Sequence, residues 1–391
     1  AYRWEASGAI AIVGDSNQRT VTIRGVHAGS GTLKLTVEAG GAEKTDEKTI
    51  TVTGGTGTGG QGDPGAGDSA PAAPGTAPKS EDNKIDILID GEAALAGTVT
   101  TGEKDGQPVT IITLDLSNAD ELLDGRDDGI VMTIPATGAS GNVIVRLSGQ
   151  NAEALKDKGV VLEIKTDLAT YTLPVRQIEF GGVDPQDVTI EIEVGFASEK
   201  MAAKAEQAAE RENFTLVAPA VTFSVTAQYG GESVGIPVFD AYVKHLIAIP
   251  NGVDPDTVTT VVVIESDGTI RHVPTKVVVV DGKPYAQVSS LTASGAYAMV
   301  SHSPEFGDVA EHWAKEAVED LGSRLIVKGV GDGRFNPDAS VTRAEFAAMI
   351  VRALGLFAED DTPEFADVDG TAWYNDAVAA ARRYGLIDGF E

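Results

Sequence analysis

The sequence predicts a multidomain protein with β-sandwich-like N-terminal and middle domains followed by an all-α C-terminal region. At 391 residues the chain exceeds what one hydrophobic core usually supports. Short alternating runs of Val, Ile and Thr dominate the chain before Pro304, and alternation of this kind is typical of half-buried strands. Beyond Pro304 the apolar residues recur at helical spacing.

Residues 1–53 have the pattern of part of a β domain. Tyr2, Trp4 and the turn Gly29-Ser30-Gly31-Thr32 resemble the second half of a bacterial immunoglobulin-like domain. That resemblance implies that the first half of the domain precedes Ala1, so we expect the chain to be a piece of a longer protein. The strands expected here cover residues 10–13, 20–23, 32–37 and 49–52.

Residues 54–83 are rich in Gly, Pro and Ser and contain no run of large apolar side chains that could form a core. Gly55, Gly57 and Gly60 have the spacing of a dinucleotide-binding loop, but no strand precedes them and no helix follows. We interpret the segment as a flexible spacer with a root-mean-square span of about 30 Å.

The middle of the chain is predicted to form two β-rich subdomains, residues 84–180 and 181–303, the second of α+β type. The tetrapeptide Gly-Val-Asp-Pro at 182–185 recurs at 252–255, which indicates a repeated turn into a strand or a duplicated β unit. Helices are expected at 151–156 and 198–211, and Ser117-Asn118-Ala119-Asp120 could cap one more. The expected strands are 85–89, 109–114, 130–134, 143–147, 160–165, 188–194, 221–227, 242–248, 258–264, 276–280 and 285–288.

Charge and composition exclude several classes of partner. The chain has 59 acidic and 30 basic residues, and a net charge of -29 repels nucleic acid and anionic lipid headgroups.

The chain has no cysteine, so disulfides and thiolate zinc sites are ruled out. No apolar run is long enough to span a membrane. The five histidines show no metal-ligand spacing, and we predict neither a metal nor a cofactor, although loose acidic calcium sites stay open.

Two patterns could suggest an enzyme. Gly231-Glu232-Ser233-Val234-Gly235 fits the nucleophile elbow Gly-x-Ser-x-Gly, but β-like stretches flank it on both sides, which favours a hairpin turn. The many carboxylates do not identify a glycosidase pair, because that chemistry depends on separation in space. We therefore predict no catalytic residue.

The C-terminal region contains an internal repeat. Phe306-Gly307-Asp308-Val309 matches Phe365-Ala366-Asp367-Val368 at an offset of 59 residues, and Trp313 matches Trp373 at an offset of 60. A period near 60 indicates tandem modules.

The complete repeat contains a second helix with clear end signals. Thr342 and Glu345 have the spacing of a capping box, and Gly355 can end the helix in a left-handed conformation. We expect the residues at i, i+3, i+4, i+7 and i+8 to face the core. They are Phe346, Met349, Ile350, Ala353 and Leu354.

These motifs together resemble the S-layer homology (SLH) module. Its signature is carried by Phe306-x-Asp308-Val309, His312-Trp313-Ala314, Gly331-Asp332-Gly333-x-Phe335-x-Pro337 and Thr342-Arg343-Ala344-Glu345. Residues 304–358 look like one complete module and 359–391 like a truncated second one. The resemblance implies an exported, non-catalytic surface protein of Gram-positive bacteria of the Bacillus or Paenibacillus type. It also implies binding of a secondary cell-wall polysaccharide, often pyruvylated, in grooves between neighbouring modules.

The expected ligand-binding residues suit an acidic sugar. Arg343 at a helix N-terminus can pair with a carboxylate, Trp313 and its repeat partner Trp373 can stack on a sugar face, and Gly331 allows close approach of the backbone. Asp308 and Asp332 can accept hydrogen bonds from hydroxyl groups. Structural roles stay open for each: Trp313 in the core, Arg343 in an ion pair, and the two aspartates in turns.

Two other functions stay open. The chain could be the wall-anchored tail of a cell-surface glycoside hydrolase whose catalytic domain lies upstream or within residues 84–300; a deep cleft with two facing carboxylates would favour it. It could also be an adhesin or a lattice protein that associates with copies of itself in a surface layer.

Overall fold

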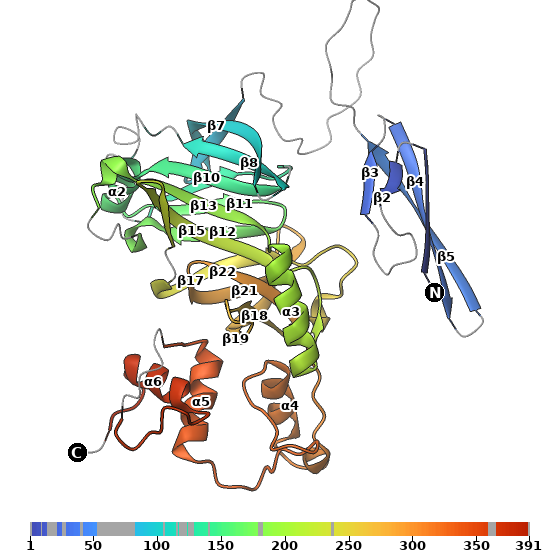
Figure 1. The fold of residues 1–391 in the computed structure, drawn as a ribbon, viewed down its shortest axis with the longest axis vertical. Coiled ribbons are helices and arrows are strands. Elements are labelled where there is room, and N and C mark those ends of the chain that lie inside the picture. Colours follow the sequence, from blue (N-terminus) through green and yellow to red (C-terminus); the bar gives the residue numbers. More distant parts are fainter. Residues whose placement is uncertain are drawn as a thin grey trace, which may run out of the picture. The chain divides into compact units, whose positions relative to one another are not determined.

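The computed structural model describes residues 2–8, 10–13, 22–25, 29–39, 42–52, 83–104, 106–114, 116, 123, 129–139, 141–178, 183–235, 238–358 and 365–389. The chain forms two compact units, Ala1–Pro74 and Gly75–Glu391 (Figure 1). The spacer predicted at residues 54–83, except for Asn83, and the cap predicted at Ser117–Asp120 lie outside the described residues.

The first unit consists of antiparallel strands. Strands β1 (Tyr2–Gly8), β4 (Gly29–Ala39) and β5 (Ala42–Val52) form one sheet in the order β1-β4-β5, and β2 (Ile10–Val13) pairs with β3 (Thr22–Gly25). The strands predicted in this unit are thus present, and β1 is an addition. The immunoglobulin-like assignment stays a prediction.

The second unit is built on one large sheet, in which seventeen strands of the described chain are joined by hydrogen bonds. In the described part of this region the sheet is accompanied by the helices α2 (Gly149–Asp157) and α3 (Glu199–Glu212), capped by Ser148 and Ser198. The strands are β6 (Lys84–Ile89), β7 (Glu92–Lys104), β8 (Gln107–Leu114), β9 (Val131–Pro135), β10 (Asn142–Ser148), β11 (Val161–Lys165), β12 (Ala169–Pro174), β13 (Thr189–Phe196), β14 (Thr215–Leu216), β15 (Val221–Tyr229), β16 (Glu232–Gly235), β17 (Val238–Ala248), β18 (Thr260–Ile264), β19 (Ile270–Val273), β20 (Thr275–Val280), β21 (Lys283–Thr292) and β22 (Gly295–Ser301).

The sheet branches at β6, which pairs with both β7 and β9. One branch continues through β8, β10, β13, β15, β22 and β18, and the other through β11, β12, β17, β21 and β20. Side chains of both branches share one buried cluster. Tyr171 of β12, for example, stacks on Phe223 of β15 with ring centroids 4.8 Å apart. The two branches therefore enclose a single core.

This architecture corrects the predicted fold class for the middle of the chain. The pairs β10–β13 and β12–β17 join residues that we assigned to separate β-sandwich-like subdomains. Local alternation predicted most strands but could not predict their partners, because pairing depends on contacts between distant segments. The recurring Asp-Pro sequence is a repeated capped turn: Asp184 accepts from the Gln186 N–H and Asp254 from the Asp256 N–H.

The all-α expectation for the C-terminal region is also wrong. Over residues 304–358 and 365–389 the region contains three short helices, α4 (Lys315–Ser323), α5 (Arg343–Leu354) and α6 (Asn375–Arg383), and one 3-10 turn, η4 (Gly307–Val309). Turns and irregular backbone connect them. In the longest described connection the backbone takes positive φ at several positions, which a helix cannot accommodate. These are Leu325, Gly331, Asp332, Gly333 and Asn336.

Helix α5 packs on α6 through small residues. Ala347 and Val351 form a buried cluster with Ala380 and Ala381, and Leu291 of β21 joins it. The predicted core face is different from the observed one: Phe346 is 59% exposed and Leu354 is exposed as well. The sequence offered two apolar stripes on this helix, and the alanine stripe allows the closer helix–helix approach.

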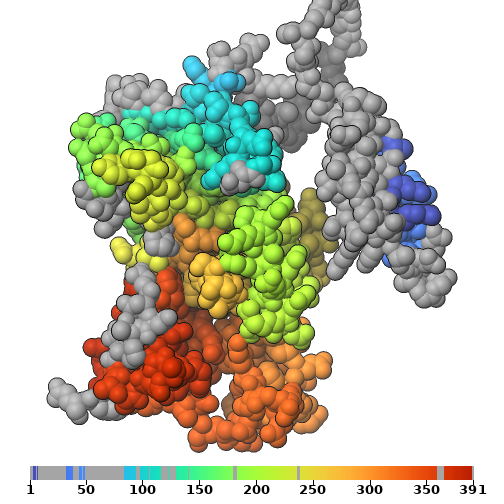
Figure 2. Space-filling view, in the orientation of Figure 1, coloured from blue at the N-terminus to red at the C-terminus, as the bar shows by residue number. Residues whose placement is uncertain are grey.

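The modules are attached to the sheet by specific contacts. The Arg271 guanidinium on β19 donates to the Gly355 carbonyl at 3.0 Å and lies 4.3 Å from the centre of the Phe357 ring. The Thr259 hydroxyl donates to the Ser323 carbonyl at 3.0 Å. Figure 2 shows the orange and red modules directly against the sheet. Among the described helices, none has the length and apolarity needed to cross a bilayer.

Candidate functional site

Asp308 organises the loop that precedes α5. Its two carboxylate oxygens accept hydrogen bonds from the backbone N–H groups of Phe335, at 2.8 Å, and Asn336, at 2.7 Å. These hydrogen bonds lower the pKa of Asp308, and the one from Phe335 has the larger effect. The carboxylate is therefore ionised near neutral pH and holds the loop closed across 27 residues of sequence.

Asp332 and Gly333 occupy the tip of a tight turn. Both have positive φ, 52° and 67°, and the Arg334 N–H donates to the Gly331 carbonyl at 3.0 Å. Positive φ at both central positions defines a type I′ turn, which Asp-Gly favours. The turn presents Asp332 to solvent.

The start of α5 is fixed by the predicted capping box. The Glu345 N–H donates to the Thr342 hydroxyl at 3.2 Å, and the Thr342 N–H donates to Glu345 Oε2 at 2.8 Å. Hydrogen bonds from Thr342 lower the pKa of Glu345, and the bond from the backbone N–H has a larger effect than the one from the hydroxyl. Arg343 is the first residue of the helix and is exposed, so its cation and the helix N-terminus face solvent together.

A groove of about 400 Å³ lies beside this loop and takes its walls from both modules. The first module contributes the segment around Val330 and Phe335 and one side of α5, and the second contributes Trp373. Trp373 is 63% exposed and meets the Tyr374 ring edge-on, with centroids 5.4 Å apart. An accessible indole and an apolar floor can support the flat face of a sugar ring.

Two cations line the same groove, and the sequence analysis missed both. Lys328 lies 2.9 Å from the Glu212 carboxylate at the end of α3. Arg352 is partly buried, and its pKa is lowered by burial while Glu212 opposes that shift. The signal was present in the helical spacing, since Glu345, Met349 and Arg352 follow at i, i+4 and i+7 and share one face.

The six predicted site residues do not form one cluster. Trp373 lines the groove, whereas Arg343, Gly331 and Asp332 lie on the neighbouring loop and helix start, and Asp308 braces that loop. Trp313 is 90% exposed beside the His312 ring, because α4 begins only at Lys315. Trp313 is thus neither in the core, as one interpretation had it, nor in the groove.

Other chemistry has less support in the described part of the chain. There, no three His, Asp or Glu side chains are grouped in a way that could hold a metal ion. The Gly231–Gly235 segment follows a turn between β15 and β16, so it is the predicted hairpin and does not form a nucleophile elbow.

Comparisons with known proteins assign the C-terminal region. The S-layer homology domain matches residues 305–347 and 364–391. Over 84 residues the chain is 46% identical to endo-1,4-beta-xylanase A of Thermoanaerobacterium saccharolyticum, covering 22% of this chain and 7% of that protein. Over 77 residues it is 43% identical to the surface-layer 125 kDa protein of Lysinibacillus sphaericus, covering 20% and 6%.

A longer match includes the sheet. The chain is 27% identical over 287 residues to amylopullulanase of Thermoanaerobacterium thermosulfurigenes, which covers 73% of this chain and 14% of that protein. The chain thus spans a small part of each of these relatives. No solved structure matches it significantly. Domains of the matched family generally bind cell-wall polysaccharide. The C-terminal region of this chain carries S-layer homology modules like those of Gram-positive surface proteins, and the protein is extracellular and located at the cell wall.

Proposed function

We propose that this chain is a non-catalytic part of a surface protein that is held on the cell wall by an acidic, pyruvylated secondary cell-wall polysaccharide. The observation that carries the proposal is the groove between the two modules, which Trp373 lines together with Lys328 and Arg352. An aromatic face next to cations suits a sugar ring that bears a carboxylate.

The local charge matters because the whole chain is strongly acidic. A net charge of -29 opposes association with a negative polymer, so attraction must come from a concentrated group of donors. In the groove, Lys328 and Arg352 outnumber the one carboxylate of the lining, Glu345, even though Lys328 also pairs with Glu212. Arg343 adds a cation at the start of α5. Arginine suits this role because its guanidinium can meet a carboxylate with two parallel hydrogen bonds.

Binding to purified cell-wall sacculi tests the proposal. We expect the protein to sediment with intact sacculi and to stay in solution after the non-peptidoglycan polymer has been removed. A chemically depyruvylated polymer should compete poorly with the native polymer. Retention on stripped sacculi would contradict recognition of the polymer.

Substitution of Arg343 tests the predicted carboxylate contact. Arg343→Ala should weaken binding by on the order of 1.5 to 3 kcal/mol if the guanidinium pairs with the pyruvate carboxylate. Thermal stability should change little, because the side chain is exposed. Equal losses of binding and of stability would make the residue structural.

One observation favours a second candidate. The match to amylopullulanase is longer than the C-terminal modules and therefore includes much of the sheet. The chain could accordingly be the wall-anchoring tail of a cell-surface glycoside hydrolase with its catalytic domain upstream. Hydrolysis of starch or pullulan by the chain itself would place catalysis within it.

We further propose self-association in a surface layer, which sedimentation velocity at rising protein concentration tests.

A further inference from the structure

A second concave surface lies on the sheet, away from the modules. It is a trough of about 480 Å³ between the end of the β7–β8 hairpin and the first turn of α3. Figure 2 shows the hairpin, in cyan, and α3, in green, on the same face of the unit. The volume is within the ~300–1,000 Å³ range typical of small-ligand sites. Residues on its floor and walls include Lys104, Asn142, Glu193, Phe196, Met201 and Ser224.

The floor of the trough is rigid. Asn142 Oδ1 accepts from the Phe196 N–H at 3.0 Å, and its Nδ2 donates to Glu193 Oε1 at 3.0 Å. The amide fits only because residue 195 is glycine, since a Cβ there would lie 2.0 Å from the Asn142 side chain. Gly141, with a φ of 72°, likewise leaves no room for a Cβ against the Pro108 carbonyl. Side chains held in this way are preorganised for a ligand.

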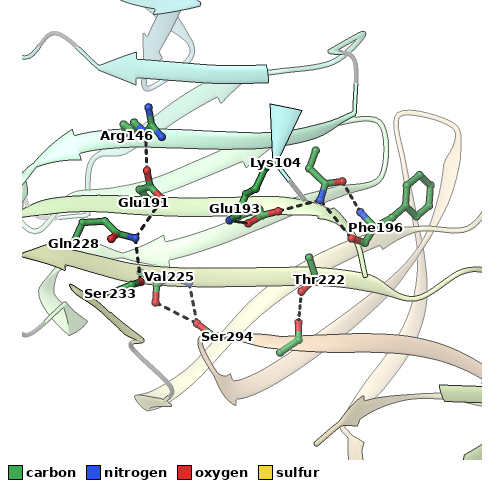
Figure 3. A network of polar contacts seen from close by, with 12 residues as sticks. Lys104, Arg146, Glu191, Glu193, Phe196, Thr222, Val225, Gln228, Ser233 and Ser294 are labelled. Carbon is green, nitrogen blue, oxygen red and sulfur yellow. Dashed lines mark hydrogen bonds and ion pairs between the residues drawn. The ribbon is translucent and has the colours of Figure 1, made fainter. Parts of the chain in front are cut away.

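The trough carries one cation, Lys104, against two carboxylates, Glu193 and Glu199. Lys104 Nζ lies 2.6 Å from Glu193 Oε2. Further along the same face, Arg146 Nε lies 2.7 Å from Glu191 Oε1, and the Gln228 amide joins Glu191 to the Ser233 hydroxyl (Figure 3). Arg146 and Glu191 lie on the paired strands β10 and β13, whereas Lys104 reaches Glu193 from β7, which β8 and β10 separate from β13 in the sheet. Nothing in this arrangement favours an anion, and the net charge of -29 works against one.

The two carboxylates do not have the arrangement of a glycosidase pair. Glu191 and Glu193 lie two residues apart on one face of β13, whereas such enzymes place their carboxyl groups on either side of the scissile bond. Both accept hydrogen bonds from a cation. Carboxylate, amide, ammonium and hydroxyl groups side by side can both donate to and accept from neutral hydroxyl groups.

We propose that this trough binds a segment of a neutral, hydroxyl-rich glycan. The charges of its lining, Lys104 against Glu193 and Glu199, separate it from the groove between the modules, where two cations, Lys328 and Arg352, line the wall with one carboxylate, Glu345. The chain would then hold two glycans of different charge, one in the groove and one on the sheet. This second site does not depend on the first.

Titration of the complete chain with malto-, cello- and xylohexaose tests the proposal, with hexagalacturonate as the anionic comparison. At least one neutral hexasaccharide should bind saturably, and hexagalacturonate should not. Ser224→Trp, which fills the trough, should weaken binding by about tenfold or more. Thr189→Trp is the matched control, because it adds the same indole ring to an exposed position outside the trough. Thr189 is on the face of β13 that also carries Glu193, and its substitution should leave the affinity unchanged.

Two further variants keep the outcome interpretable. If Ser224→Trp lowers the thermal midpoint, Lys104→Ala replaces it, because Lys104 is at the exposed end of β7 and its loss removes a donor without crowding the floor. Trp373→Ala should leave oligosaccharide binding intact while it weakens binding to sacculi. The proposal is overturned if no neutral hexasaccharide binds, if binding is insensitive to both trough variants, or if hexagalacturonate binds as well as the neutral sugars.

Discussion

The sheet and the C-terminal modules bury their large side chains to very different extents. In the sheet, Tyr171, Phe223 and Tyr297 are at most 1% exposed and share one aromatic cluster. In the modules, Trp313 is 90% and Trp373 63% exposed, and the cluster between α5 and α6 consists mostly of alanines and small aliphatic residues.

The difference indicates that the sheet is stabilised by its own core, whereas the modules depend on the sheet for part of theirs. A large buried core stabilises the sheet by itself, since burying an aromatic side chain contributes about 1.5–3 kcal/mol. The modules have a small core, and Arg271 and Leu291 of the sheet complete it. The exposed aromatic side chains are thereby accessible for the ligand contacts proposed above. The loss of stability at acid pH and two substitutions in the modules test this difference.

Acid should destabilise the sheet through His245. This histidine is fully buried, accepts from the Thr172 N–H through Nδ1, and its Nε2 has no hydrogen-bond partner. Burial lowers its pKa from 6.5 to about 3. Between these values the unfolded chain binds more protons, so stability falls as the pH drops from about 6.5 and levels off near 3. The full loss is about 5 kcal/mol.

Urea unfolding followed by near-ultraviolet circular dichroism at a series of pH values measures this effect. His272 should add a smaller loss of stability in the same direction. Its pKa is lowered to about 4, first by burial and then by the nearby charges of Arg324 and Arg271. His245→Asn keeps an acceptor for Thr172 but cannot titrate in this range, so its acid slope should be shallower. An unchanged slope in that variant would rule out His245 as the cause, and His302→Asn serves as the control.

The docking of the modules should depend on Gly355. This residue ends α5 with a φ of 64°, and an added Cβ would lie 2.9 Å from the His272 carbonyl oxygen. Gly355→Ala should cost about 2–3 kcal/mol, from backbone strain together with the displaced sheet contact. Thermal unfolding and proteolysis near α5 measure the loss.

Gly385→Ala is the matched control, because Gly385 has a φ of 68° with nothing near its missing side chain. It should lose only the strain component, about 1 kcal/mol. Equal losses at both positions would show that the sheet contact does not contribute to module stability.

The smallest expected effect is at the capping box of α5. Thr342→Ala removes the hydroxyl that accepts from the Glu345 N–H, and it should cost about 1 kcal/mol. The same change weakens the helix end on which Arg343 stands, so the loss of sacculus binding should be smaller than for Arg343→Ala. A larger loss of binding for Thr342→Ala than for Arg343→Ala would indicate that the Thr342 hydroxyl, and not the Arg343 guanidinium, contacts the polysaccharide.

Local signals in the sequence predicted the elements better than their arrangement. Alternation found most strands, and Thr342, Glu345 and Gly355 marked both ends of α5. Strand β7 was missed because Gly97 and Gly102 interrupt its pattern. The pairing of β6 with β9, which places Leu88 opposite Thr133, joins segments far apart in the chain, and no local rule specifies it.

The candidate site could be predicted in part. The repeat identified Trp373, but Lys328 and Arg352 became visible as partners only once the loop and α5 were placed around one groove. The role of Asp308 as a brace depends on two backbone N–H groups distant in sequence, so the motif alone could not separate it from ligand binding.

The most direct test of the account compares the two tryptophans that are equivalent in the repeat. Trp373→Ala should reduce the affinity for pyruvylated wall polysaccharide by about tenfold or more, because it removes the aromatic face of the groove. Trp313→Ala changes an even more exposed ring that does not line the groove, and it should alter the affinity far less. Equal affinities for Trp373→Ala and the unmodified chain, or a larger loss for Trp313→Ala, would contradict binding in the groove.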